Sequence, residues 1–87
     1  MTETKTDQPV RDIRVIPDPE DPTRGWEVRV DGEKISWHRT KDKAVRRGSR
    51  EGRSRAPAEL TVFRLDGSIS EHRMYKPADD GDAGRSS

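Results

Sequence analysis

A run of basic side chains at helical spacing, in the middle of the chain, is the feature of this sequence that could carry chemistry. Five of them fall on one arc of a helix that turns about 100° per residue: Lys43, Arg46, Arg47, Arg50 and Arg53. They span about 15 Å at a rise of 1.5 Å per residue, and the planar fork of arginine matches phosphate oxygens. Arg39 and Lys41 would extend this surface at the helix entry. The pattern predicts contacts with several successive phosphates of DNA or RNA.

The helix that must position these side chains is predicted over residues 40–55. Small or apolar residues occupy the opposite arc: Ala44, Val45, Gly48, Ser49 and Gly52. Thr40 suits the N-cap position, and Asp42 in the first turn suits the positive end of the helix dipole. Each glycine costs a helix about 1 kcal/mol relative to alanine, so we expect this face to approach a sheet closely. Alternatively, Gly52 ends the helix in a left-handed turn, which would remove Arg53 from the basic face.

The positive charge is local. The whole chain has a formal net charge of +1, but residues 39–55 contain eight basic and two acidic residues, whereas residues 1–38 sum to −3 and residues 56–87 to −2. Such segregation is typical of a binding face rather than of a generally adhesive protein.

Alternating apolar and polar residues predict strands on both sides of the helix, at residues 10–16, 26–30, 33–37, 60–65 and 68–75. Asp31-Gly32 and Asp66-Gly67 are strong hairpin-turn signals, although the register of the second hairpin stays open. The predicted fold is a small single α+β domain, β-β-β-α-β-β, whose mostly antiparallel sheet carries the helix on one face. The compact domain is expected over residues 10–76, between a disordered arm at 1–9 and a disordered acidic tail at 77–87.

The first hairpin also predicts where the two tryptophans lie. A two-residue turn pairs Val30 with Glu33, Val28 with Ile35 and Trp26 with Trp37. The tryptophans would then form a cross-strand aromatic pair in the core, under the helix. The alternative is an exposed platform on which bases stack.

Candidate catalytic residues are scarce, and the sequence predicts no enzyme, cofactor or metal site. His38 and His72 lack a second ligand at i+3 or i+4 and are expected on the solvent side of strands. No phosphate-binding glycine loop or nucleophile elbow is present. The acidic loop at residues 17–25 lacks the oxygen spacing of a calcium loop, so a solvated turn or an internal partner for arginines is expected there.

The composition indicates where the protein is expected to be found and whether it acts alone. The chain is 87 residues long, 26% hydrophobic and 40% charged, and has no cysteine. No apolar run approaches a membrane span, so a soluble, cytoplasmic protein without a membrane partner is expected. Because so small a core leaves a monomer marginal, a homodimer or a bound partner is also compatible with the sequence.

Several short motifs resemble one protein family. They are Val15-Ile16-Pro17, Gly25-Trp26-x-Val28, the helix with Ala44 and further small residues, Ala58-Glu59-Leu60-x-Val62, Asp66-Gly67 and Tyr75. Over residues 10–75 the chain resembles the small bacterial and phage proteins grouped as domain of unknown function 2188. The resemblance implies a compact α+β domain and brings no activity with it. Members usually have an alanine-rich helix, whereas here glycine replaces some small residues and arginine crowds the outer face.

The function predicted from these patterns is a small non-enzymatic module that binds the nucleic-acid backbone through its basic helix face. One alternative is a protein-interaction module, encoded by a phage or mobile element, that docks on an acidic host protein. The other is a helix whose outer face is basic only because it is solvated.

Overall fold

The computed structural model describes residues 9–77, and the two expected arms lie outside that range apart from Pro9 and Pro77. One helix and five strands follow in the order β-β-β-α-β-β: β1 (Arg11–Pro17), β2 (Trp26–Val30), β3 (Glu33–His38), α1 (Lys41–Ser54), β4 (Ala58–Phe63) and β5 (Ile69–Tyr75). This order and the α+β class agree with the prediction. Within residues 9–77, no helix is long and apolar enough to cross a membrane.

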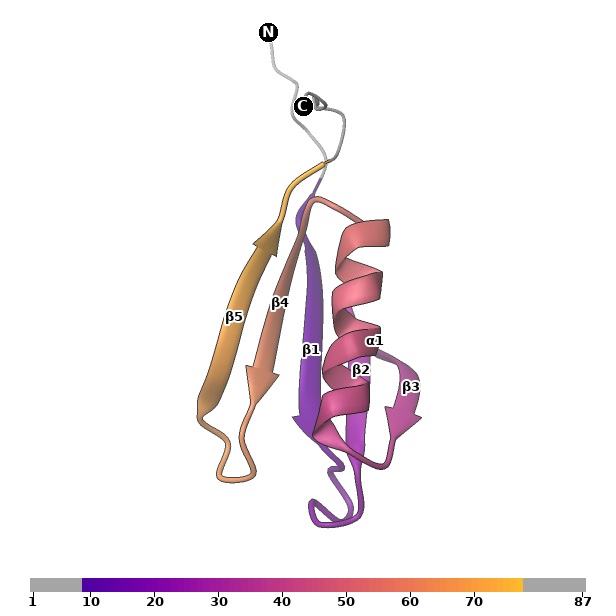
Figure 1. Ribbon diagram of the computed structural model, residues 1–87, viewed down its shortest axis with the longest axis vertical. Helices are drawn as coiled ribbons and strands as arrows, with labels where there is room; N and C mark the ends of the chain where they lie inside the picture. Colours follow the sequence, from indigo (N-terminus) through magenta and orange to yellow (C-terminus); the bar gives the residue numbers. More distant parts are fainter. Residues whose placement is uncertain (1–8, 78–87) are drawn as a thin grey trace, which may run out of the picture.

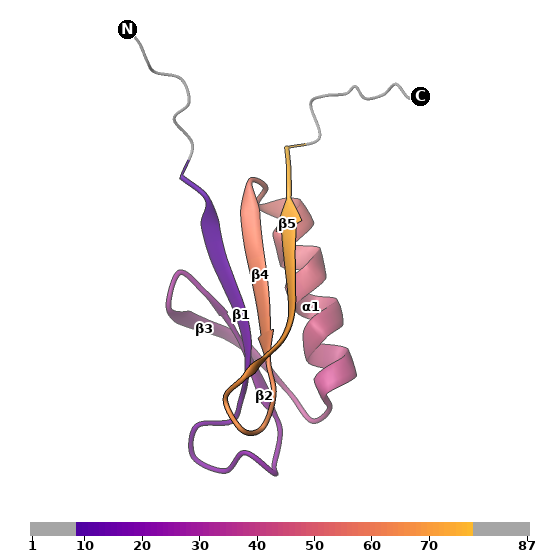
Figure 2. The ribbon, with the colours of Figure 1, turned by 90° about the vertical axis from the view of Figure 1, so that its left-hand side faces the viewer.

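All five strands form one mixed sheet in the order β3-β2-β1-β4-β5. β1 lies at its centre, antiparallel to β2 and parallel to β4, and the other two pairings are antiparallel. The second hairpin therefore joins the first through β1, a point that the sequence left open. Helix α1 lies along one face of the sheet (Figures 1 and 2).

The core lies between α1 and the sheet. Its buried members come from four elements, and none is more than 4% exposed: Ile13, Val15, Val28, Val30, Ala44, Ala58, Leu60 and Val62. The strand members recur at every second position, as the alternation of a half-buried strand requires. Ile13 and Val15 point to the helix, and Arg14 between them is exposed.

The first hairpin has the predicted turn. Asp31 and Gly32 both have positive φ, 52° and 86°, which is the condition for a two-residue turn that matches strand twist. Val30 pairs with Glu33 as predicted. Farther from the turn the ladder shifts, because Arg29 pairs with Lys34 but Val28 pairs with Ser36, which leaves a bulge at Ile35.

The bulge makes the predicted tryptophan pair wrong. Trp26 pairs with His38, and Trp37 pairs with Glu27. Trp26 stays half-buried and packs against the core, as one interpretation predicted. Trp37 lies instead beside the β1–β2 loop, where its indole N–H donates to a carboxylate oxygen of Asp18 at 3.0 Å.

Asp18 lies in the acidic β1–β2 loop, and its carboxylate binds other side chains of the same domain. It is 3% exposed, accepts from the backbone N–H of Glu20 at 2.9 Å, and lies 3.3 Å from the guanidinium of Arg24. That backbone N–H, together with the indole of Trp37 and the charge of Arg24, holds the pKa of Asp18 below its ordinary value despite burial. The carboxylate of Asp18 therefore binds Arg24 of its own loop and Trp37 of β3. An internal partner for arginine was one of the two roles expected for this loop.

The second hairpin follows the two-residue register over most of its length. Ala58 to Val62 pair with Tyr75 to Glu71, and a shift occurs only beside the turn, where Phe63 pairs with Ile69. Leu60 and Arg73 consequently share the helix face of the sheet. This register places a charged β5 side chain next to α1.

Candidate functional site

The helix that carries the basic residues has the predicted start and a different end. Thr40 caps it, with its hydroxyl oxygen accepting from the backbone N–H of Lys43 at 3.3 Å. At the other end the helix runs through Gly52 to Ser54, and the backbone N–H of Arg55 donates to the carbonyl of Glu51 at 2.9 Å. The alternative in which Gly52 ends the helix is therefore wrong. Arg53 stays on the helix, in its last turn.

The residues on the inner face of α1 have small side chains or none, and the sheet lies close to them. Ala44, Gly48, Ser49 and Gly52 are its buried residues. A Cβ atom added at Gly48 would lie 3.0 Å from Leu60 Cδ1 and 3.1 Å from Val15 Cγ2. At Gly52 it would lie 2.6 Å from the ring of Tyr75. The glycines, which are costly for a helix, therefore allow the close approach that was predicted.

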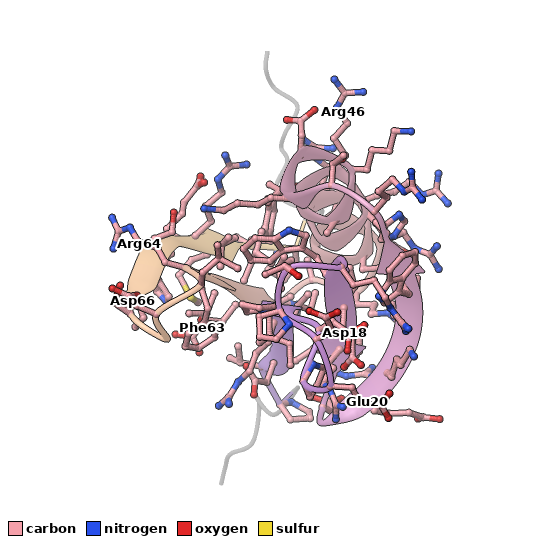
Figure 3. The ribbon with its side chains drawn as sticks, turned by 90° about the horizontal axis from the view of Figure 1, so that it is seen from below. Asp18, Glu20, Arg46, Phe63, Arg64 and Asp66 are labelled. Carbon is pink, nitrogen blue, oxygen red and sulfur yellow. The ribbon has the colours of Figure 1, made fainter. Side chains whose placement is uncertain are left out.

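The outer face carries a line of cations that we call the basic stripe: Lys43, Arg46, Arg50 and Arg53. All four side chains are exposed, and their spacing of three, four and three residues keeps them on one arc. Figure 3 shows Arg46 standing out from α1, away from the sheet. The stripe borders a shallow depression of about 730 Å³, to which Arg47 and Arg73 also contribute and in which Asp42 is the one acidic side chain.

Ion pairs divide the predicted basic residues into two groups. Glu51, whose side chain is 12% exposed, binds Arg47 at 2.9 Å and Arg55 at 2.7 Å. Arg46 lies 3.3 Å from Asp42, but both side chains are more than three-quarters exposed, so this pair is weak. Among residues 9–77, no carboxylate forms an ion pair with Lys43, Arg50 or Arg53. Arg47 is therefore paired with a half-buried carboxylate, whereas the stripe has only the exposed pair of Arg46 with Asp42 within residues 9–77.

The two residues predicted to extend the surface behave differently. Arg39 is exposed just before the helix. Lys41 is half-buried and turned toward the sheet, where its ammonium donates to Ser70 Oγ at 3.1 Å and lies 5.5 Å from the centre of the Trp26 ring. Lys41 therefore belongs to a different part of the surface from the stripe.

Two residues near the stripe were not predicted. Arg73 of β5 donates to Ser49 Oγ at 3.4 Å and pairs with Glu71. The two-residue register of the second hairpin was the signal that could have placed Arg73 there. His38 of β3 is half-buried rather than on the solvent side as expected, and its Nε2 lies 3.0 Å from Ser36 Oγ. Burial lowers the pKa of His38, and the charges of Arg47 and Lys43 lower it further.

His72, the other histidine, lies elsewhere. It is exposed, as predicted, and its Nε2 is 2.5 Å from a carboxylate oxygen of Glu59. Within the described span, no three histidine, aspartate or glutamate side chains gather in a group that could hold a metal ion.

A five-stranded mixed sheet carrying one helix with a basic outer face defines a small α+β domain. The chain belongs to a family described as an uncharacterized protein conserved in bacteria (DUF2188), whose model matches residues 13–75. The family resemblance inferred from the short motifs is thereby confirmed. No curated protein and no solved structure matches the chain.

Proposed function

We propose that this domain is a non-enzymatic module that binds the phosphate backbone of nucleic acid through the basic stripe. The observation that carries the proposal is the state of Lys43, Arg50 and Arg53, which are exposed and form no ion pair with any carboxylate of residues 9–77. If the basic face served only solubility, we would expect its cations to form ion pairs with carboxylates nearby, because acidic residues are numerous in this chain. Here the one half-buried acid of the helix, Glu51, pairs with Arg47 and Arg55 instead.

The stripe is held on a rigid support. Its helix lies against β1 and β4 through Gly48, so the four cations keep their spacing along one line. Phosphates could replace Asp42 as the partner of Arg46 at little cost, because an exposed ion pair contributes only about 0–1 kcal/mol. Cations carried on a packed helix lose less conformational freedom on binding a polyanion than cations on a loop, because their backbone is already ordered.

Contacts of this kind carry little sequence information. Phosphate contacts position a protein on nucleic acid, whereas base contacts specify the sequence. A stripe of arginine and lysine along a helix whose other face is fixed to a sheet offers mainly phosphate contacts. The expected binding is therefore sensitive to salt and weakly selective for sequence.

A salt titration tests the proposal. Fluorescence anisotropy with labelled duplex DNA, duplex RNA and single strands should give a log affinity that falls linearly with log salt. Four neutralised phosphates predict a slope of about −3.6 on duplex DNA and about −2.8 on a single strand. No binding to any of these nucleic acids at low salt would overturn the proposal. Capture of an acidic protein after nuclease treatment would then test the alternative partner.

Charge reversal on the stripe should abolish the binding. We expect Arg46→Glu with Arg50→Glu to weaken it at least about 30-fold, since two pairs of about 1 kcal/mol are lost and repulsion is added. The fold should persist because both side chains are exposed. The matched control is Arg14→Glu with Lys76→Glu, which changes the net charge equally at exposed positions away from the stripe. An equal loss in both double variants would indicate that net charge, not the stripe, governs binding.

A further inference from the structure

A second pocket lies at the end of the molecule where α1 begins. It has a volume of about 450 Å³ and is lined by Trp26, Lys41, Arg64, Leu65 and Asp66. This size lies within the range of about 300–1,000 Å³ that is typical of pockets for small ligands. The view along this end shows Arg64 and Asp66 on the β4–β5 turn (Figure 3). The pocket thus brings together the start of β2, the first turn of α1 and the β4–β5 turn.

Its walls are an aromatic ring and an exposed aliphatic side chain. Trp26 is half-buried, and the ammonium of Lys41 lies 5.5 Å from its ring centre. Leu65 is 60% exposed at the tip of the turn, away from the apolar core. The side chain over the ring is a flexible lysine, so a flat ligand could replace its ammonium on the ring while the lysine turned to a phosphate.

The rim of the pocket is net basic. Arg64 is fixed there by donating to the carbonyl of Ile69 at 2.7 Å and to Ser68 Oγ at 3.2 Å. Asp66 accepts from the hydroxyl of Ser68 at 2.7 Å and from its backbone N–H at 2.9 Å, so one oxygen of this carboxylate is engaged within the turn. The lining therefore carries two cations, Lys41 and Arg64, against one carboxylate.

We propose that this pocket binds a nucleobase of a single-stranded nucleic acid whose phosphates lie along the basic stripe. An aromatic wall beside cations is the combination with which proteins bind single strands, by base stacking and backbone attraction. The pocket lies beside Lys41, the first residue of α1, and the stripe begins two residues later at Lys43 on another side of the helix, so one strand would pass around the first turn of α1 to reach both. The inference rests on the proposed function and adds a preference for unpaired bases over duplex.

Trp26 fluorescence gives a direct test. In a Trp37→Phe variant of the full chain, Trp26 is the only tryptophan. Titration with oligothymidylate of about 12 nucleotides, within the usual site size, should quench Trp26. Inorganic polyphosphate of similar length and duplex DNA should bind without quenching it, because neither offers an unpaired base. Quenching by polyphosphate to the same extent would overturn the pocket assignment.

Variants of the two walls separate this proposal from the proposed function. Trp26→Leu should lower affinity for oligothymidylate about 5- to 100-fold, as loss of one stacked base does, while polyphosphate affinity stays unchanged and Trp26→Phe restores most of the loss. Leu65→Ser at an exposed position should act in the same direction if Trp26→Leu does not fold. Equal effects on both ligands would overturn the pocket alone. Failure of the unaltered protein to bind either ligand would overturn the stripe as well.

Discussion

Glu51 determines which arginines of the helix are available to a partner. Its carboxylate accepts from Arg55 and from Arg47, and these two hydrogen bonds hold the pKa of Glu51 below its ordinary value although burial opposes them. The same residue fixes the end of α1, since its carbonyl accepts from the backbone N–H of Arg55. One residue therefore stabilises the fold, and its carboxylate lowers the charge beside the basic stripe.

Glu51→Gln should separate these two effects. Loss of charge-assisted hydrogen bonds should lower the free energy of unfolding by about 1–2 kcal/mol, measured by denaturant titration. The released Arg47 and Arg55 should raise affinity for a polyanion and make the salt slope steeper by about 0.9 for each additional phosphate neutralised. Glu59→Gln, on β4 and away from α1, is the control for the change in net charge. An unchanged slope in Glu51→Gln would mean that Arg47 and Arg55 do not reach the bound polyanion.

At the level of elements, the close packing of α1 on the sheet depends on the small residues of its inner face. The sequence predicted this close packing because two glycines in a helix need a compensating reason. It could not predict which residue each glycine meets. Gly48 faces methyl groups of Leu60 and Val15, whereas Gly52 faces the flat ring of Tyr75 at a shorter distance.

The two glycines should therefore respond differently to alanine. Gly52→Ala should lower the free energy of unfolding by up to about 2 kcal/mol, because an overpacking cost of about 1–3 kcal/mol exceeds the gain of about 1 kcal/mol in helix propensity. Gly48→Ala should cost less, since the added Cβ would lie 3.0 and 3.1 Å from its nearest neighbours rather than 2.6 Å. Thermal or denaturant unfolding of both variants makes the comparison. Stabilisation by Gly52→Ala would contradict the packing of Tyr75 against this turn.

In the first hairpin, the turn could be predicted from the sequence but the strand register could not. Asp31-Gly32 specified the first turn correctly because only a few residue types accept positive φ at both positions. The bulge at Ile35 has no comparable local signal. It accompanies a contact between Trp37 and Asp18, 19 residues apart, and a close approach at Gly25, where a Cβ would lie 2.3 Å from the Trp37 ring. Long-range contacts of this kind decide a register that alternation alone leaves free.

For the whole molecule, the segregated charge was visible in the sequence, but its internal pairing was not. The prediction placed five cations on one face, and the structure keeps four of them exposed there while pairing Arg47 with Glu51. Lys41 is directed to Trp26, and Arg73 arrives from a strand that follows the helix. Counting charges locates a basic face, whereas the side-chain contacts of several elements decide which charges stay available.

The stability of the domain should fall on acidification in two steps. Burial and the charges of Arg47 and Lys43 depress the pKa of His38 from its ordinary 6.5, so the unfolded chain binds this proton more readily than the folded one. The free energy of unfolding should therefore fall as pH drops below about 6.5. Asp18 and Glu51 have depressed pKa values, so the stability that they contribute above their ordinary 3.8 and 4.5 is lost as pH falls through the lowered values.

Denaturant titrations from pH 8 to pH 3 would measure both steps, in a range chosen to cross about 6.5 and about 4. His38→Gln should remove the upper step and leave the lower one. His72→Gln, at the exposed histidine, is the matched control and should leave the upper step in place. A profile that stays flat between pH 7 and about pH 5 in the unaltered protein would contradict the depressed pKa of His38.

The parallel pairing of β1 with β4 delays completion of the sheet during synthesis. Arg11 meets Ala58, a residue that leaves the ribosome 47 positions later. Until then the nascent chain can form only β1, β2, β3 and α1, with one edge of β1 unpaired and two of the five strands, β4 and β5, still missing. Closing so long a segment is slow relative to local hairpin formation. The central strand is thus made first and completed last, which leaves its open edge as the place where a growing chain is most exposed to wrong pairing.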